Sequence, residues 1–389
     1  MRRYRDLLRI PGVGKLTAAV LLGRVATSMF NLALLVAVTQ RYGYASAGLL
    51  LMVFAVCNAV AGPVRGRQAD RRGPRRVLLW LVAGHAVAWA GLLTGLLANA
   101  PLAVLGVAAA ALGVSIPPAG PAVRGLWPTI VPAEQLPATY AFDAALNTTT
   151  FIAGPMIAGG LLLAMPAPAV VVVTGVVKVT GDLLVALSPA LRKMPGKPPH
   201  GGFFGPLAHS RVRLLLGMIA LDTFAFGCLE VGAVAAASGR GTAGVFTSAL
   251  SVGAVISGIT YGARTWPGTS RIQLVVLHAT GAVVLAATGL VHVLVLTAVA
   301  YGVYGLFNGP VETLQQLLVG DLTPEGQRIE AFAWVFSVMW AGFGIGTTVA
   351  GRLVSDGQPA GALFAAAAAQ VLVAVVALAR LSRPYDTNT

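Results

Sequence analysis

The sequence predicts an all-α membrane protein whose twelve transmembrane helices form two six-helix bundles related by a pseudo-twofold axis. Composition is the first observation behind this prediction. Of the 389 residues, 57% are hydrophobic and only 10% are charged, whereas a soluble domain carries about 25% charged residues. This composition excludes a water-soluble globule. The second observation is an internal repeat between the two halves of the chain.

Twelve apolar stretches are each long enough to cross a bilayer, which takes about 20 residues. In chain order the expected helices cover about 17–40, 45–64, 76–98, 102–123, 138–163, 168–190, 212–237, 243–263, 271–290, 292–318, 328–354 and 360–381. The segment 191–210 is rich in Gly, Pro and basic residues and reads as a linker. We therefore expect an N-terminal six-helix bundle (1–190), a cytoplasmic linker (191–210) and a C-terminal six-helix bundle (211–389).

Breaks between and within these helices follow from local composition. The basic segment 1–15 is expected to lie on the cytoplasmic membrane face. A tight turn at 99–101 separates the third and fourth helices. Pro117, Pro118 and Pro121 interrupt the inner end of the fourth helix. Prolines are tolerated in membrane helices where neighbouring groups satisfy the freed carbonyls.

The distribution of basic residues predicts the orientation. Most of the 27 Lys and Arg residues fall in the termini or in loops of one parity. Arg124 is assigned here to the loop between the fourth and fifth helices. Because cytoplasmic loops carry the excess of Lys and Arg, both termini are expected in the cytoplasm. The net charge of +14 thus reflects topology, and we expect no nucleic-acid partner.

The internal repeat is visible at nearly constant spacing. Gly23 overlays Gly217, and Gly120-Pro121 overlays Gly309-Pro310. Further along, Gly154 overlays Gly346. Two halves of equal topology are related by an axis along the membrane normal, with the solute site at the midplane between them.

The loop 66–76 carries a motif. Its sequence follows the pattern G-x-x-x-D-R-x-G-x-R-R, which resembles the signature loop between helices 2 and 3 of the major facilitator superfamily (MFS). The alternative is a generic basic loop, which would explain the arginines but not the Asp and both glycines at this spacing. The resemblance implies a latch that braces one half against the other in one state and releases in the other. Its residues are Gly66, Asp70, Arg71, Gly73, Arg75 and Arg76.

A second element lies in the fifth helix. Gly154, Pro155 and Gly159 resemble the Gly-Pro signature of drug:proton antiporters. Small residues let helices approach closely and Pro bends a helix, although ordinary small-residue packing is the alternative. The membrane-embedded Arg that these exporters carry in helix 4 is missing, because the matching position is near Ala109.

Charges inside the spans are costly and need a reason. Arg24 lies in helix 1, Asp222 and Glu230 in helix 7, and Glu312 in helix 10. The resemblance implies that these helices line the central cavity. We hypothesise that Glu230 or Asp222 takes up a proton in a manner coupled to solute, the alternative being a static ion pair. Asp143 and Asn147 are further candidates for contact with the cavity. Asn31 could hydrogen-bond either a solute or a neighbouring helix.

Other polar residues within spans are expected to be structural. Lys178 and Asp182 are four residues apart on one helical face and should neutralise each other. Single histidines and cysteines in apolar runs are expected to pack rather than to bind metal, relay protons or form a disulfide. They are His85, His278, Cys57 and Cys228.

These patterns together predict a secondary active transporter that works by alternating access and is not an enzyme. The leading hypothesis is proton-coupled export of a small, largely apolar drug or metabolite. The alternatives are a proton-coupled importer or facilitator of an organic solute and a non-transporting sensor. No nucleotide loop or metal-ligand cluster occurs in the sequence, so we expect no cofactor and no metal. The expected partners are a small-molecule substrate, protons and the lipid bilayer, with the protein a monomer in the plasma membrane.

Overall fold

The computed structural model describes residues 2–192, 194, 196, 205–236, 242–291 and 293–380. Across these ranges the chain is helical and contains no strand. Twelve of the described segments are long and apolar enough to cross a membrane. The predicted fold class is therefore confirmed. Much of the expected linker 191–210, namely 193, 195 and 197–204, lies outside the described residues.

The first half of the chain holds six of these spans. Its elements are α1 (Arg2–Arg9), α2 (Val13–Arg72), α3 (Pro74–Leu97), α4 (Leu102–Ser115), α5 (Ala119–Ile130), η1 (Ala133–Gln135), α6 (Leu136–Ala164), α7 (Ala167–Ala186) and α8 (Pro189–Arg192). The long α2 contains two spans, Val13–Tyr42 and Leu49–Arg72. Phe30 and Phe54 would be about 36 Å apart in a straight helix, yet their ring centroids are 4.8 Å apart. The two spans of α2 therefore fold back on each other.

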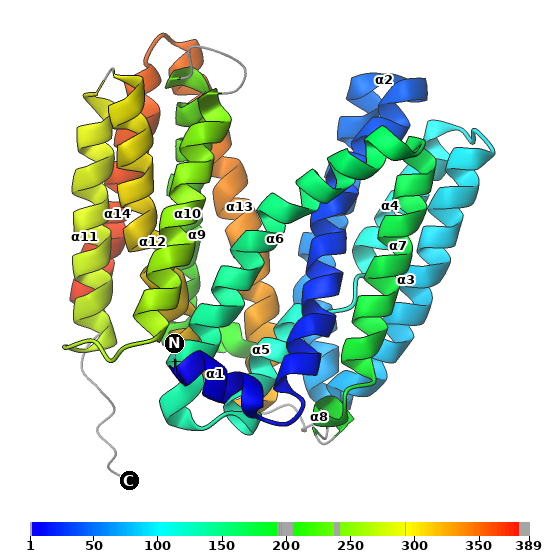
Figure 1. Cartoon of the computed structure of the whole chain (residues 1–389), viewed down its shortest axis with the longest axis horizontal. Helices are drawn as coiled ribbons and strands as arrows, with labels where there is room; N and C mark the ends of the chain where they lie inside the picture. Colours follow the sequence, from blue (N-terminus) through cyan, green and yellow to red (C-terminus); the bar gives the residue numbers. More distant parts are fainter. Residues whose placement is uncertain are drawn as a thin grey trace.

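The second half holds the other six spans. Its elements are η2 (Gly205–Ala208), α9 (Ser210–Ala236), α10 (Thr242–Gly262), α11 (Ser270–Gly289), α12 (Leu294–Leu322), η3 (Glu325–Gln327), α13 (Arg328–Ser355) and α14 (Pro359–Arg380). Figure 1 shows the two halves as separate helical bundles side by side. Each bundle has buried apolar clusters of its own.

The fourth span is broken into α4 and α5, and Arg65 fills the break. Its guanidinium donates to the carbonyls of Gly113 (2.9 Å) and Val114 (3.1 Å) at the end of α4. It also donates to the side chain of Asn58 at 2.7 Å. Neighbouring donors thus satisfy carbonyls that the prolines leave free.

The fourth span continues through α5 to Ile130. The prediction that this helix ends at 123, and that Arg124 belongs to a loop, is therefore wrong. Pro117 and Pro118 break the hydrogen-bond ladder without ending the crossing, because α5 resumes the helix at Ala119. Arg124 is buried inside the molecule.

The two bundles meet at the end of the molecule that carries α1, α5 and α8, which we call the closed end (Figure 1). A buried apolar cluster there joins residues of both halves, including Val123 and Tyr140 from the first and Ile329 and Phe332 from the second. The rings of Tyr140 and Phe332 are 6.1 Å apart. At the opposite end, the far end, the ribbons of the two bundles diverge (Figure 1).

Candidate functional site

Three charged side chains from different spans of the first half form a buried group. Asp143 of α6 lies between Arg24 of α2 and Arg124 of α5, at 2.8 Å and 2.7 Å. Arg24 also donates to the backbone carbonyl of Asp143 at 3.3 Å. The carboxylate is 4% exposed. Two guanidiniums face one carboxylate, so this group, which we call the arginine pair site, carries one surplus positive charge.

A carboxylate from the second half complements that surplus. Glu312 of α12 interacts electrostatically with Arg124 and Arg24. Its Oε1 atom accepts a hydrogen bond from Gln316, one turn further along α12, at 3.2 Å. Glu312 is half-buried. Opposite charges of the two bundles therefore attract each other across the interface between the halves.

Two amide side chains continue the faces that carry this site. Asn31 follows Arg24 by seven residues, about two turns, and so shares its face of α2. Asn147 follows Asp143 by one turn of α6 and is half-buried, whereas Asn31 is exposed. Both positions lie on the far-end side of the charged group, where they could contact a solute that approaches it.

The two acids of α9 lie elsewhere. Glu230 is exposed on α9, about one turn beyond Phe226. Asp222 is buried and faces the interior of the second bundle. Its carboxylate accepts hydrogen bonds from Gln370 at 2.8 Å and Gln315 at 3.3 Å. The structure therefore places neither Asp222 nor Glu230 in the arginine pair site. Asp222 lies on the side of α9 that packs against α12 and α14, whereas Glu230 is exposed.

The loop motif lies at the closed end, where the halves touch. The carboxylate of Asp70 accepts hydrogen bonds from the backbone N–H groups of Ile329 (3.3 Å) and Glu330 (2.8 Å) at the start of α13. A carboxylate at this position also complements the positive end of the helix dipole. A Cβ atom on Gly66 would lie 2.8 Å from the Cα of Glu330, so only glycine permits this approach.

The remaining motif residues lie at the junction of α2 and α3. Gly73 separates α2 from α3 with φ of +87°, a conformation that favours glycine. The backbone carbonyl of Arg71 lies close to Gly196 of the linker between the two halves. Arg75 is half-buried and Arg76 is exposed in the first turn of α3.

The Gly-Pro element of α6 packs on the first span. A Cβ on Gly154 would lie 2.4 Å from the Cβ of Ser28 in α2, so the glycine permits close helix contact. Pro155 lies within α6. Gly159 has no other atom within 4 Å of such a Cβ. The close approach of the two helices therefore depends on Gly154 alone among these glycines.

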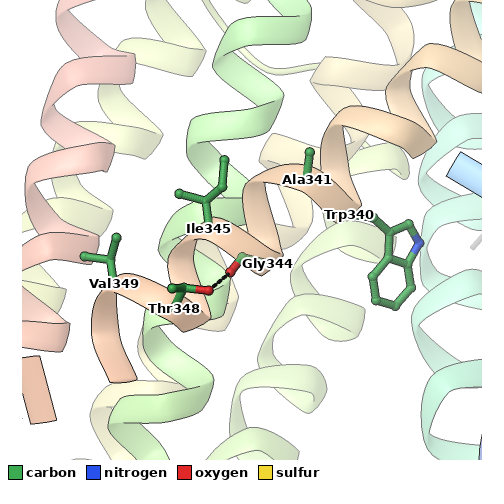
Figure 2. A pocket seen from close by; sticks show the side chains of 6 residues that line it. All are labelled: Trp340, Ala341, Gly344, Ile345, Thr348 and Val349. Atoms are coloured by element: carbon green, nitrogen blue, oxygen red, sulfur yellow. Dashed lines mark hydrogen bonds between the residues drawn. The ribbon is translucent and has the colours of Figure 1, made fainter. Parts of the chain in front are cut away.

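Toward the far end, α13 contacts the first half at Ser337 and then lines a hollow. Near the middle of the helix, the Ser337 hydroxyl donates to the carbonyl of Ala59 in α2 at 2.8 Å. Beyond it, one face of α13 lines a hollow of about 390 Å³, and Thr348 donates to the Gly344 carbonyl at 2.8 Å (Figure 2). The residues that line the hollow are Trp340, Ala341, Gly344, Ile345, Thr348 and Val349.

Three polar residues with buried contacts in the structure were not identified as such from the sequence. Arg124 was assigned to a loop because the prolines before it resemble a helix end. Arg65 directly precedes the loop motif in the sequence and was not considered, yet it is buried against α4. Gln370 in α14 joins Asp222 to its neighbours. A single glutamine within an apolar span is the only sequence signal that could have identified it.

The comparisons with known proteins agree with this architecture. The family model described as Major Facilitator Superfamily matches residues 16–294. An uncharacterized MFS-type transporter, y4rN of Sinorhizobium fredii, is 25% identical over 99% of this chain and 98% of its own length.

Solved structures with the same fold include a bacterial homologue of the iron transporter ferroportin in an outward-facing state (TM-score 0.78, 15% identity, 95% of this chain and 99% of that chain). Another is the Escherichia coli fucose:proton symporter FucP (TM-score 0.76, 16% identity, 97% and 100%). The family is one of transporters that bind small-molecule substrates, and its members are not enzymes. With its family model matched over most of its length and its two six-helix bundles, this multi-pass membrane protein belongs to the major facilitator superfamily.

Proposed function

We propose that the protein is a proton-coupled exporter of a small, largely apolar organic compound, with Glu312 as the proton acceptor. The observation that carries the proposal is the electrostatic attraction between Glu312 and the two arginines of the arginine pair site, across the interface between the halves. With Glu312 ionised, the two carboxylates balance the two guanidiniums. A proton on Glu312 leaves the surplus positive charge without a partner. Proton uptake therefore changes the attraction between the bundles, as coupled transport requires.

The character of the site supports an apolar substrate. Arg24, Arg124 and Asp143 already pair with one another, so an uncharged solute leaves their ion pairs intact. Toward the far end, the exposed side chains of α9 and α13 include Phe226 and Trp340. Aromatic and apolar walls with a few polar groups suit small organic ligands.

One feature favours export, namely the Gly-Pro element of α6, which resembles that of drug:proton antiporters. Arg124 is a buried arginine in the fourth span. It lies fifteen residues beyond Ala109, so the exporter arginine expected at that position is still missing.

The orientation follows from charge. The closed end carries α1 and the loop 66–76, which are rich in arginine. Because arginine-rich segments stay on the cytoplasmic side, we place the closed end and both termini in the cytoplasm of a plasma-membrane protein. The contact of Asp70 with α13 then holds the cytoplasmic side shut. We take the working unit to be a monomer, because each chain contains both halves of the site.

The test of coupling uses purified protein in liposomes with a trapped pH-sensitive dye and a panel of lipophilic compounds. The wild type should move protons when a transported compound is added. Glu312→Gln should bind the compound but lose compound-dependent proton movement, since the amide cannot ionise. Glu230→Gln is the matched control and should behave like the wild type. Equal proton movement in Glu312→Gln and the wild type would exclude Glu312 as the acceptor.

The latch has its own test, because the closed-end contact depends on glycine. Gly66→Ala places a methyl group 2.8 Å from the Cα of Glu330, so it should push the halves apart and raise the population of the state open at this end. Distances between spin labels on the two halves measure that population. Gly84→Ala is the control, since a Cβ there has no other atom within 4 Å. Unchanged distances in Gly66→Ala would exclude the latch.

An importer or facilitator is the competing function. The same liposomes distinguish it, because symport moves solute and proton in the same direction. A facilitator would move the solute without any proton, and in that case Glu312→Gln should leave the solute flux unchanged.

A further inference from the structure

A cavity of about 330 Å³ lies at the closed end, between the two bundles. The first half lines it with residues of α2, α3, α5, α8 and the linker, and the second half lines it with residues of η3 and α13. We call this cavity the interbundle pocket. None of its described lining residues belongs to the arginine pair site. Its volume is at the lower end of the range for ligand pockets, so it suits a small organic molecule.

Much of the pocket wall is apolar. The first half contributes Pro74 and Ile130 among others, and the second half contributes Ile329. The hydroxyl of Thr129, which also lies in the wall, donates to the Leu126 carbonyl at 2.8 Å. This donor is therefore used within α5. A ligand that fills the pocket needs an apolar body to cover such a wall, because apolar surfaces gain free energy when they leave water together.

The charged side chains of the wall have a surplus of negative charge. Asp70 and Glu325 carry carboxylates, whereas Arg328 is the one cation among the described lining residues. The Nε atom of Arg328 donates to the Gly320 carbonyl at 3.2 Å. Its guanidinium is attracted by Asp70 and also by Asp321, which lies outside the wall. The wall therefore favours a ligand that carries a positive charge.

Two arginines near the pocket interact with a different acid. Arg67 lies 3.8 Å from Glu330, and Arg71 also attracts this carboxylate. Asp70 keeps acceptor capacity for a ligand. Its two oxygens accept one backbone N–H each, from Ile329 and Glu330, whereas an ionised carboxylate has about four acceptor sites. An ammonium group can therefore donate to Asp70 without displacing the contact that joins the halves.

We propose that the interbundle pocket binds a small organic ammonium ion with an apolar body, and that the bound ion holds the closed end shut. The two walls come close together here, because a Cβ atom on Gly125 would lie 3.3 Å from a side-chain carbon of Ile329. Separation of the bundles divides the binding groups between them. A ligand that binds one of two states shifts the population toward that state. The ion therefore inhibits transport from outside the transport site, whether or not transport is coupled to protons.

The first test measures the binding of phenethylamine, which is a cation at neutral pH, by saturation-transfer NMR with the purified protein. The wild type should bind this amine at about millimolar concentration, as expected for so small a molecule. The uncharged analogue phenethyl alcohol should bind about fivefold more weakly, because it lacks the attraction to the carboxylates. Glu325→Gln should weaken binding of the amine by about two- to fivefold for the same reason.

A variant that fills the pocket provides the control for its location. Thr129→Trp places a large side chain in the pocket and should remove binding of the amine. Thr94→Trp is the matched control and should bind like the wild type. Both threonines are exposed, and both hydroxyls donate to a carbonyl of their own helix.

The second test measures how binding changes the state of the halves. Spin labels on the two bundles report the ratio of molecules closed at this end to molecules open at this end. Phenethylamine should raise this ratio in linear proportion to its concentration, by about tenfold at ten times its dissociation constant. The measurement is made with the wild-type pocket and again in Gly66→Ala, whose open population is expected to be larger.

Three results would each overturn the proposal. They are equal binding of the amine and the alcohol to the wild type, unchanged binding of the amine in Thr129→Trp, and a ratio of closed to open molecules that the amine does not raise. The first of them needs no variant to fold. None of these measurements involves proton movement, so they can fail independently of the proposed function.

Discussion

Asp143 and Asp222 are both aspartates buried inside a transmembrane bundle, yet their surroundings differ. Asp143 in the first half contacts two guanidiniums, whereas Asp222 in the second half accepts hydrogen bonds from two amides and lies beside a histidine. The first arrangement has a surplus charge that Glu312 of the other bundle complements. The second is contained within its own bundle. When the bundles move apart, the interaction between Glu312 and the arginine pair site must therefore change. The hydrogen bonds of Asp222 can stay intact, because all their partners move with the second bundle.

The largest expected difference comes from neutralising each aspartate. Asp143→Asn leaves Arg24 and Arg124 buried without a counter-charge, so the free energy of unfolding should fall by about 3–5 kcal/mol. Asp222→Asn keeps acceptor and donor capacity beside two glutamines and should lower it by only about 1 kcal/mol near neutral pH. Denaturant unfolding of both variants in the same detergent measures the two values. Equal losses would show that the counter-charges do not distinguish the sites.

The contrast between the two sites was only partly predictable from sequence. Composition, the repeat and the loop motif predict the twelve spans and the two bundles, because apolar stretches and repeated segments can be recognised in the order of residues along the chain. They do not determine which side of a helix faces the other bundle. Helix 7 was expected to line the cavity, and from that Asp222 was taken as a cavity residue. The structure shows instead that this side of α9 meets Gln370 and Gln315, which lie 148 and 93 residues further along the chain.

The arginine pair site shows the same limit for a different reason. Arg24, Asp143 and Glu312 were identified because charged residues in apolar spans are conspicuous. Arg124 was missed because three prolines before it indicated a helix end. A broken helix can resume when a neighbour satisfies its free carbonyls, and here the guanidinium of Arg65 does so from α2. That compensation involves a residue 48 positions away and cannot be read from the local sequence.

A smaller effect is expected from the amide that organises the second site. Gln370→Met removes the donor to Asp222 and Tyr304 and the acceptor of His278, so the free energy of unfolding should fall by about 2–3 kcal/mol. Tyr301→Phe is the matched control in the same bundle. It removes one neutral hydrogen bond to the Leu229 carbonyl (2.9 Å) and should cost about 1 kcal/mol. A loss for Gln370→Met no larger than that of the control would mean that Asp222 does not depend on its amide donor.

The smallest effect should appear at a third buried aspartate, Asp182. It pairs with one cation, whereas Asp143 pairs with two and Asp222 accepts hydrogen bonds from neutral amides. Asp182 of α7 pairs with a single cation, Lys178, at 2.8 Å on the same helix. The double change Lys178→Met with Asp182→Asn removes both charges together, so the free energy of unfolding should change by no more than about 1 kcal/mol and transport should be unaffected. Lys178→Met alone is the control and should be the less stable protein, because it leaves Asp182 uncompensated. If the double variant instead loses as much stability as Asp143→Asn, the cost of a buried aspartate would depend on its position in the bundle rather than on its counter-charge.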